Sequence, residues 1–419
     1  MAKVSLTNTY KTYPEYKDSE VDWVGQIPKS WDMGTSRRLF STTKKLASET
    51  NSEKVLSLTL KGVIPRVLDG SGKNPANYDT YQEFKKDDLV FCLFDYDVTP
   101  RTIGYVCEDG MMTGAYTRLI PKRETDSKFF YYFFLSLDTS KELLHQCTGL
   151  RNSISKPIFW SMKNPLPPKE EQDKIAAFLD VQTARIDASI AKKKRLIELL
   201  KEKRTAIINQ AVTKGLDPKA ELVDSGIEWI GKIPKGWEVK KLKHQLSFLD
   251  GKRIPLSTDE RTKMQGDYPY YGASGIIDYV NEYIFDEDLI LISEDGANLI
   301  NRSTPISFIA TGQYWVNNHA HIAKPKDGNI QFWSERIEQV DVSIYTTGSA
   351  QPKLTIKALA NIQISAPSDI SERLMIGAYV AQTRERFERP ISQVVESIKL
   401  LQELKSSLIS HAVTGKIKI

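Results

Sequence analysis

The sequence is poor in cysteine and has no long apolar run. Its three cysteines, Cys92, Cys107 and Cys147, all lie in the first half of the 419 residues and match no paired metal-ligand spacing. A disulfide scaffold and a zinc site are therefore both disfavoured, and the chain is typical of a reducing compartment. No window offers the roughly 18 consecutive apolar residues of a membrane span, and the N-terminus has no apolar segment like that of a signal peptide. We therefore expect a cytoplasmic protein that does not enter a membrane.

Motifs of the common catalytic classes are also missing. The segment DGSGKNP at 69–75 lacks the spacing of a phosphate-binding loop, so the sequence predicts no ATP hydrolysis by this chain. The segment NPLPP at 164–168 is not the Asn-Pro-Pro-aromatic tetrapeptide of an amino-methyltransferase, and FDEDLILISEDG at 285–296 has the acids of a nuclease strand without its lysine. The histidines are scattered except for His319 and His321, which have no third ligand nearby in sequence. We expect no catalytic residue, no metal and no cofactor in this chain.

A short segment occurs twice. DSEVDWVGQIPKSWDM at 18–33 returns as DSGIEWIGKIPKGWEV at 224–239, and the second tryptophans of the two copies, Trp31 and Trp237, are 206 positions apart (237 − 31 = 206) without a gap. We call these two segments the tags. Tryptophans that flank Ile-Pro are more typical of packing than of ligand binding. The repeat itself indicates two modules of one fold.

Each tag is followed by a β-rich stretch and then by a long helical pattern. Segments such as VLSLTL, DDLVFCLF and RTIGYV predict strands, and the aromatic segment at 127–137 predicts a buried helix. No glycine or proline occurs in 169–212, which predicts one long helix, and a second stripe of apolar residues runs from 376 to 408. Pro390 lies inside this second stripe, so we expect it to kink or restart the helix.

These patterns predict an α+β fold with an internal pseudo-twofold repeat, in which two β-rich mixed α/β domains are separated by two long antiparallel helices. The expected segments are 1–165 for the first domain, 166–215 for the first helix, 216–367 for the second domain and 368–419 for the second helix. The helical stripes need a partner surface. The residues that we expect to bind a partner are Ile175, Leu179, Ile186, Ile197, Leu200, Ile391, Ile398 and Leu401.

The remaining chemistry is that of binding. The chain has 58 Lys and Arg against 53 Asp and Glu, a net charge of +5 that permits a polyanionic partner without requiring one. Polar and basic residues gather in connections rich in Gly, Pro and Asn, where Arg, Lys, Asn and Gln suit base edges and Tyr and Ser suit phosphate and sugar. The candidate DNA-binding residues are Lys61, Arg66, Arg101, Arg151, Asn152, Lys156, Tyr271, Ser274, Asn298, Arg302, Asn317, Asn318, Gln351 and Lys353.

The sequence resembles the specificity subunit of type I restriction-modification systems. The resemblance is carried by the doubled tag WxGxIPxxW, by LPPKEEQDKIAAFLD at 166–180, and in the second domain by YYGASGIIDY, EDGANL and WVNNHAHIAKP. It implies that each globular domain is a target recognition domain for one half of a split double-stranded DNA site and that the helices act as a spacer. It also implies two methyltransferase (modification) subunits and two ATP-dependent restriction subunits as partners, which would hold S-adenosylmethionine, ATP and Mg²⁺.

Two alternatives belong to other classes. In the first alternative, the chain is a coiled-coil scaffold that joins partners and binds no DNA. In the second, it is an enzyme that acts alone. Binding of duplex DNA that falls steeply with salt contradicts the first alternative. A methylation or cleavage assay on the isolated chain tests the second.

Overall fold

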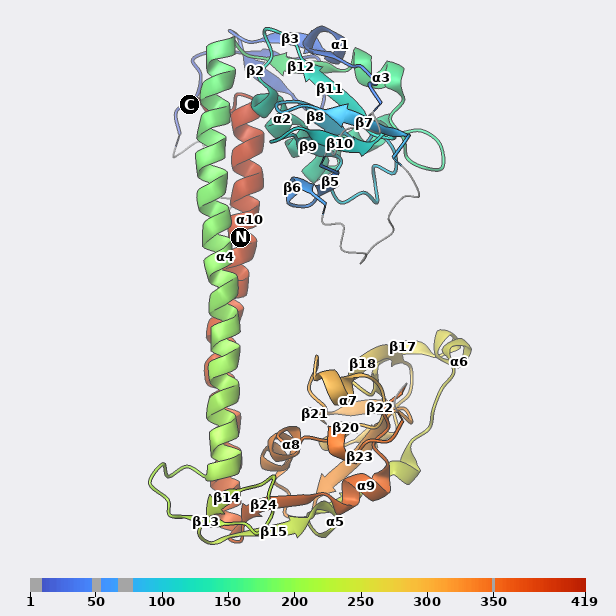
Figure 1. Cartoon of the computed structure of the whole chain (residues 1–419), viewed down its shortest axis with the longest axis vertical. Helices are drawn as coiled ribbons and strands as arrows, with labels where there is room; N and C mark the ends of the chain where they lie inside the picture. Colours follow the sequence, from blue (N-terminus) through green and yellow to red (C-terminus); the bar gives the residue numbers. More distant parts are fainter. Residues whose placement is uncertain (1–9, 47–53, 67–77, 349–350) are drawn as a thin grey trace. The chain divides into compact units, whose positions relative to one another are not determined.

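The computed structural model describes residues 10–46, 54–66, 78–348 and 351–419 (Figure 1). The chain forms two compact units, one made of residues 1–193 with 396–419 and the other of residues 194–395. The two long helices, α4 (Lys169–Lys214) and α10 (Ile370–Val413), each contribute one part to each unit. Each compact unit therefore combines one globular domain with parts of both long helices.

The first unit contains short strands and three short α-helices besides its parts of α4 and α10. Its strands are β1 (Tyr16–Asp18), β2 (Gln26–Pro28), β3 (Asp32–Thr35), β4 (Phe40–Ser41), β5 (Leu56–Thr59), β6 (Gly62–Pro65), β7 (Tyr81–Phe84), β8 (Leu89–Phe91), β9 (Ile103–Tyr105), β10 (Gly110–Thr113), β11 (Thr117–Pro121) and β12 (Lys163–Leu166). Its short helices are α1 (Ser36–Leu39), α2 (Ser127–Ser140), the 3-10 helix η2 (Glu142–Gln146) and α3 (Lys156–Ser161).

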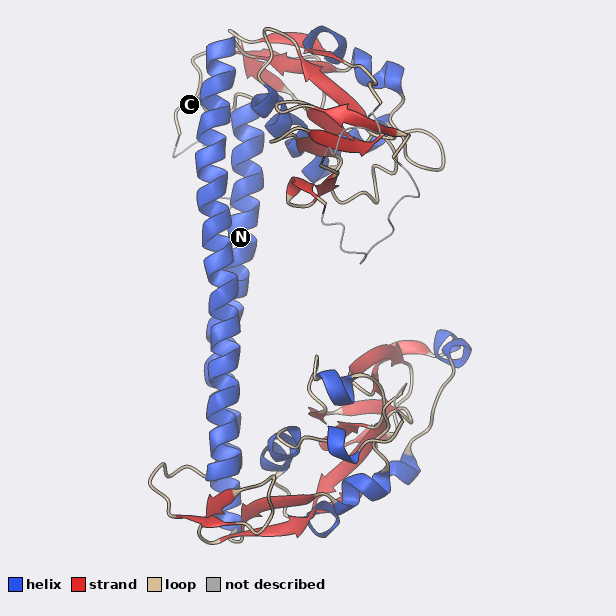
Figure 2. Cartoon of the chain, viewed as in Figure 1, coloured by secondary structure: helices blue, strands red, loops and turns tan. Residues whose placement is uncertain are grey.

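The second unit has a similar composition of elements (Figure 2). Its strands are β13 (Leu222–Asp224), β14 (Lys232–Pro234), β15 (Trp237–Lys241), β16 (Leu246–Phe248), β17 (Gln265–Gly272), β18 (Gly275–Val280), β19 (Phe285–Asp286), β20 (Leu289–Ser293), β21 (Ser307–Ala310), β22 (Gln313–Val316), β23 (Ala320–Pro325) and β24 (Gln363–Pro367). Its short helices are α5 (Leu242–Gln245), η3 (Asp250–Lys252), α6 (Thr258–Lys263), α7 (Asn298–Asn301), α8 (Ile330–Glu338), η4 (Ser343–Tyr345) and α9 (Ile356–Asn361).

The two domains share one sheet topology. The central sheet has the order β4-β11-β8-β9 in the first domain and β16-β23-β20-β21 in the second, with antiparallel pairing throughout. In each domain a strand that begins within the last residues of the tag pairs with the strand that leads into a long helix, β3 with β12 and β15 with β24. The tag itself closes a two-stranded ribbon, β1-β2 or β13-β14. The internal repeat and the α+β class expected from the sequence are therefore confirmed.

An aromatic helix forms the core of the first domain. α2 buries Phe129, Phe130, Phe133 and Phe134 completely, and each such side chain contributes about 1.5–3 kcal/mol of hydrophobic stabilisation. Asp126 caps the helix by accepting a hydrogen bond from the backbone N–H of Phe129. The buried helix expected at 127–137 is confirmed. α8 has the corresponding role in the second domain, where Phe332 and Trp333 are buried.

The second tryptophan of each tag anchors the start of a long helix. Trp31 is buried and its Nε1–H donates to Glu171 Oε2 at 3.1 Å, in the first turn of α4. Trp237 makes the equivalent bond to Glu372 Oε1 at 3.0 Å, in the first turn of α10. A carboxylate in the first turn also complements the helix dipole. The expectation that the tag tryptophans pack is therefore confirmed for this pair, whereas Trp229 of the second tag is 40 % exposed.

Each tag also receives the end of a long helix. Residues of the last turns of α10, among them Leu408, Ala412 and Val413, lie in the same core as Trp31. Ile208 and Val212 near the end of α4 lie in the same core as Trp237. The N-terminal segment and the C-terminus meet in the first unit, where the backbone N–H of Lys418 donates to the carbonyl of Lys11 at 2.7 Å.

Helix α10 is not restarted by Pro390, so that part of the sequence-based expectation is wrong. The proline removes one backbone hydrogen bond, but the helix continues because apolar side chains on both sides of it, including Phe387 and Leu408, are buried. Helix α4 begins at Lys169 as expected and ends at Lys214. Among the described residues, no helix combines the length and the apolar composition that a membrane crossing needs.

The two glycines that end the long helices provide a matched test of this packing. Gly415 and Gly215 both have positive φ, +69° and +78°, so alanine is strained at either position by about 1 kcal/mol. A Cβ at Gly415 would in addition overlap the Pro28 ring and lie 3.1 Å from Trp31, whereas the nearest atoms at Gly215 are 3.6 Å away. We expect Gly415→Ala to lower the thermal unfolding midpoint more than Gly215→Ala, as measured by tryptophan fluorescence of the full chain. Equal effects would show that the tag does not hold the helix end this closely.

Candidate nucleic-acid interface

A turn that begins with Thr-Gly stands at the same place in both domains. In the first domain Thr148 and Ser153 pair across the turn 148–153, and in the second Thr347 pairs with Lys353. We call these the TG turns. Each turn is bonded to the segment that follows a strand of the central sheet. After β8, the backbone N–H of Asp95 donates to the carbonyl of Arg151 at 2.7 Å, and after β20 the backbone N–H of Gly296 donates to the carbonyl of Pro352 at 3.0 Å. The fold therefore presents equivalent turns with different side chains.

Arg151 is the most firmly oriented candidate of the first domain. Its Nε donates to Asp95 Oδ1 at 2.9 Å, its Nη2 donates to Asp95 Oδ2, and its guanidinium lies 5.0 Å from the centre of the Phe94 ring. Asn152 follows it with a positive φ of 40°, a conformation that asparagine tolerates. Lys156 is exposed in the first turn of α3. Arg151, Asn152 and Lys156 therefore share one loop region of this domain.

The other first-domain candidates lie on different elements. Lys61 is exposed at the turn between β5 and β6, and Arg66 follows β6 with its backbone N–H bonded to Val55 O. Arg101 is half-buried in the loop before β9. The hairpin β5-β6 covers β9, since a Cβ at Gly104 would overlap Val63. Lys61, Arg66 and Arg101 therefore lie by β5, β6 and β9, on segments of the chain separate from the TG turn.

In the second domain, several candidate DNA-binding residues lie on neighbouring loops that contact one another. Tyr271 and Ser274 lie at the end of the hairpin β17-β18, and the carbonyl of Tyr271 accepts a bond from Asn317 N–H at 3.0 Å. Lys353 Nζ pairs with Glu294 Oε1 at 3.1 Å. The exposed side chains of this group are Ser274, Asn318, Gln351 and Lys353. Tyr271 is half-buried against Phe308 and Tyr314.

Three other candidates brace loops instead of facing outwards. Asn317 is only 4 % exposed and its Oδ1 accepts the N–H of His319 at 2.7 Å, so it does not offer a free surface to DNA. Asn298 bonds both the carbonyl and the N–H of Thr304. Arg302 pairs with Glu338 at 3.1 Å. Short polar side chains readily bond their own loop backbone, which a sequence pattern does not distinguish from ligand binding.

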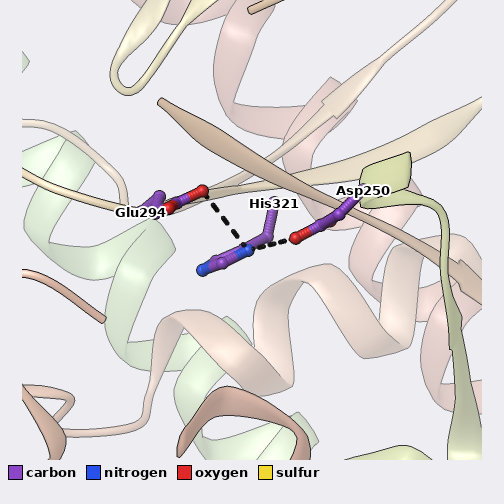
Figure 3. A group of neighbouring side chains, drawn as sticks. All are labelled: Asp250, Glu294 and His321. Atoms are coloured by element: carbon purple, nitrogen blue, oxygen red, sulfur yellow. Dashed lines mark hydrogen bonds and ion pairs between the residues drawn. The ribbon is translucent and has the colours of Figure 1, made fainter. Parts of the chain in front are cut away.

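A buried ion network joins the loops of the second domain (Figure 3). His321 on β23 contacts Asp250 Oδ2 through Nδ1 at 2.6 Å and the carbonyl of Leu354 through Nε2 at 2.7 Å. Glu294 Oε2 lies 3.7 Å from the same Nδ1. Both ring nitrogens of His321 therefore face an oxygen atom. No short sequence pattern reveals this group, because Asp250 and Glu294 are distant from His321 in the chain.

The network is balanced in charge by cations from the protein. Arg253 pairs with both Glu294 and Asp250, and it also donates to the carbonyl of Ala320 at 2.9 Å. Burial by itself would raise the pKa of Asp250, but the hydrogen bonds from His321 and from the Ile322 N–H outweigh it and lower that pKa below its ordinary value. Burial opposes the shift of Glu294 as well, yet Arg253 and Lys353 lower its pKa. Both carboxylates are therefore ionised at neutral pH.

Asp250, Glu294 and His321 also form the one group among the described residues whose donor atoms are close enough for a metal ion. Their other contacts do not fit that role. Arg253 occupies both carboxylates, and Nε2 of His321 is used by a carbonyl oxygen. A cation would have to displace a guanidinium that already neutralises the group. We interpret the cluster as an ion network that holds the loops.

The eight helix residues expected to bind a partner are all buried or half-buried by the chain itself. Ile175, Leu179 and Ile186 belong to the core of the first unit, with Leu401 packed against it. Ile197, Leu200, Ile391 and Ile398 are half-buried. The large apolar side chains that the helices leave exposed are different ones, namely Val181, Leu196, Leu199, Ile370, Leu374, Met375, Tyr379, Val395 and Leu400.

Comparison with known proteins relates both repeated domains to one family. Residues 54–199 and 234–396 both match the family described as the type I restriction modification DNA specificity domain. A type I restriction enzyme specificity subunit of Methanocaldococcus jannaschii is 24 % identical over 75 % of this chain and 76 % of its own length, and a second one is 23 % identical over 97 % of each chain. A putative specificity subunit of Haemophilus influenzae is 33 % identical, but the match covers only 33 % of this chain and 36 % of that protein.

A solved structure from a type I R-M system, described as concerning complex assembly and conformational transition, has the same fold. It aligns with a TM-score of 0.66 at 14 % identity over 92 % of this chain and 98 % of that one. Because the family matches span most of the sequence in two copies, the chain belongs to the specificity subunits of type I restriction-modification systems.

The ion network predicts a specific dependence of stability on pH. A carboxylate with a lowered folded pKa contributes stability above its unfolded pKa, and this contribution is lost as the pH falls through the folded value. Asp250→Asn is therefore expected to lower the unfolding midpoint at neutral pH, and the difference from wild type should shrink below about pH 4, the ordinary range of aspartate. The exposed Asp259→Asn is the control and should cost little at any pH. A difference for Asp250→Asn that stays constant down to acid pH would argue against this ion network.

Proposed function

We propose that this chain is the sequence-reading subunit of a type I restriction-modification complex and recognises a bipartite, asymmetric DNA target. Each globular domain would bind one half of the site. The observation that carries the proposal is that the same sheet and TG turn occur twice with different side chains, Arg151 and Asn152 in one copy and Gln351 and Lys353 in the other. Equivalent sheets and turns that carry different side chains suit the recognition of two different half-sites on one duplex.

The catalytic steps would belong to partner subunits. We propose two modification subunits that bind S-adenosylmethionine and two restriction subunits that use ATP and Mg²⁺, with this chain acting in the cytoplasm as a non-catalytic guide. The exposed apolar side chains of the long helices, such as Leu374, Met375 and Tyr379 at the start of α10, offer a surface for these partners. Side chains of this size are seldom left together on a protein surface without a partner.

The first test is binding of duplex DNA. The chain with its modification subunit should bind DNA containing the methylated motif of its host, and the logarithm of affinity should fall linearly with the logarithm of salt concentration. The scaffold alternative predicts complex formation without DNA binding. Methylation by the chain alone would contradict the division of labour proposed here.

A domain exchange tests the assignment of one half-site to each domain. Strands β15 and β24 pair with each other and place Lys241 opposite Gln363, so residues 242–362 can be replaced by those of another specificity subunit at adjoining ends. Thr35 and Lys163 are paired in the same way around residues 36–162 of the first domain. We expect each exchange to change one half of the methylated motif, read by sequencing of modified bases in cells. If either exchange alters both halves, the assignment of one half-site to each domain is incorrect.

A further inference from the structure

Arg151 has a geometry suited to one particular DNA base. The Asp95 carboxylate binds its Nε–H and one Nη2–H in a bidentate arrangement. This leaves the Nη1 hydrogens and the second Nη2 hydrogen pointing away from Asp95, as a planar fork of donors. In the major groove, guanine presents two neighbouring acceptors, O6 and N7, which match such a fork.

The guanidinium is fixed before any ligand arrives. It stacks on Phe94, whose ring is itself stacked on Tyr116 at 6.3 Å between centroids and 14° between planes. The hydrogen bond from Arg151 lowers the pKa of Asp95, so this carboxylate is ionised at neutral pH. The arginine side chain remains 65 % exposed. A rigid and exposed donor loses little conformational entropy when it binds.

Asp95 also argues against a phosphate as the ligand of Arg151. A phosphate bound by the same guanidinium would place a second anion close to the Asp95 carboxylate, and the two would repel each other. A base edge is neutral and carries no such penalty. Lys156, which is exposed and has no acid bonded to it in the described structure, has the features of a phosphate contact instead.

Leu150, the residue before Arg151 in the TG turn, is also open to contact with a ligand. Leu150 is fully exposed at 106 % of its reference area, at the tip of the TG turn beside Arg151. The equivalent turn of the second domain carries Lys353, which pairs with Glu294 and offers a point charge without a planar fork. The two turns therefore differ in the kind of contact that they can make.

We infer that Arg151, oriented by Asp95 and Phe94, reads a guanine in the half-site bound by the first domain. This inference rests on the proposed function, because it requires that the first domain binds DNA. It adds the identity of one base pair and the residue that selects it.

The test uses the full chain in complex with its modification subunit. The half-site of the first domain is identified by exchanging residues 36–162, and binding is then measured to duplexes in which each base pair of the motif is replaced in turn. For the wild type, replacing one G·C pair of that half-site should weaken binding by about tenfold to a hundredfold. In Arg151→Lys, which keeps the charge without the fork, the penalty at that one pair should fall below about threefold, while the penalties in the other half-site stay unchanged.

Two further variants separate the roles. Asp95→Asn should reduce discrimination at the same base pair and strengthen binding to duplexes without the motif, because an anion near the DNA has been removed. Lys156→Ala is the matched control and should weaken binding to every duplex by the same factor, with a salt slope reduced by about one.

Three results would overturn the inference. One is a first half-site without any G·C pair, another is an Arg151→Lys variant with undiminished penalties, and the third is an equal loss of affinity for all duplexes, as expected of a phosphate contact. A wild-type complex that binds all duplexes equally would instead refute the proposed function, so the two failures are distinguishable. Unchanged penalties in the other half-site show that the variant complex is folded.

Discussion

The structure depends on the burial of both ends of its two long helices in the cores of the two compact units. α4 has 46 residues and α10 has 44, and each helix contributes one part to each compact unit. Each tag contributes to this burial at two points. Its second tryptophan bonds a glutamate in the first turn of one helix and shares a core with the last turns of the other. Helical stability here comes from such tertiary packing more than from propensity.

The contacts that hold each domain to the helices are separate from the candidate DNA-binding loops. The paired strands β3-β12 and β15-β24 and the tags hold each domain to the helices, whereas the TG turns and the hairpin β17-β18 lie on loops at the ends of strands. Loop side chains can change without loss of the core contacts that define the fold. In the second domain an ion network also fixes the loops, since it links Asp250, Glu294 and His321 from three separate segments of the chain.

The sequence predicted those features that depend on local pattern. The gap-free repeat, the helix over 169–212 and the buried aromatic helix are visible as periodicity and composition, and the structure has all three. The helix does not restart at Pro390, because tertiary burial on both sides of the proline overrides a local preference. Asn317 and Arg302 were chosen for their chemistry, but their hydrogen-bond partners lie on the loop backbone or on another helix.

In the candidate site, too, contacts between residues distant in the chain could not be predicted from the sequence. Arg151 was found because a basic residue in a Gly-rich loop is noticeable, but its orientation depends on Asp95, 56 residues earlier. The network around His321 was missed since its members are 27 and 71 residues away. Contacts of this range are set by the order of strands in the sheet, β16-β23-β20-β21, which no short motif encodes.

The meeting of the two ends of the chain in the first unit has a consequence for its synthesis on the ribosome. Residues 396–419 are made after the second domain, yet they complete the core that contains Trp31, and Lys418 bonds to Lys11. The first unit therefore cannot finish folding until the end of α10 has been made, whereas the second unit needs nothing beyond residue 395. A nascent or prematurely terminated chain would keep the apolar surface around Trp31 uncovered, which marks it for chaperones and proteases before it can compete for DNA.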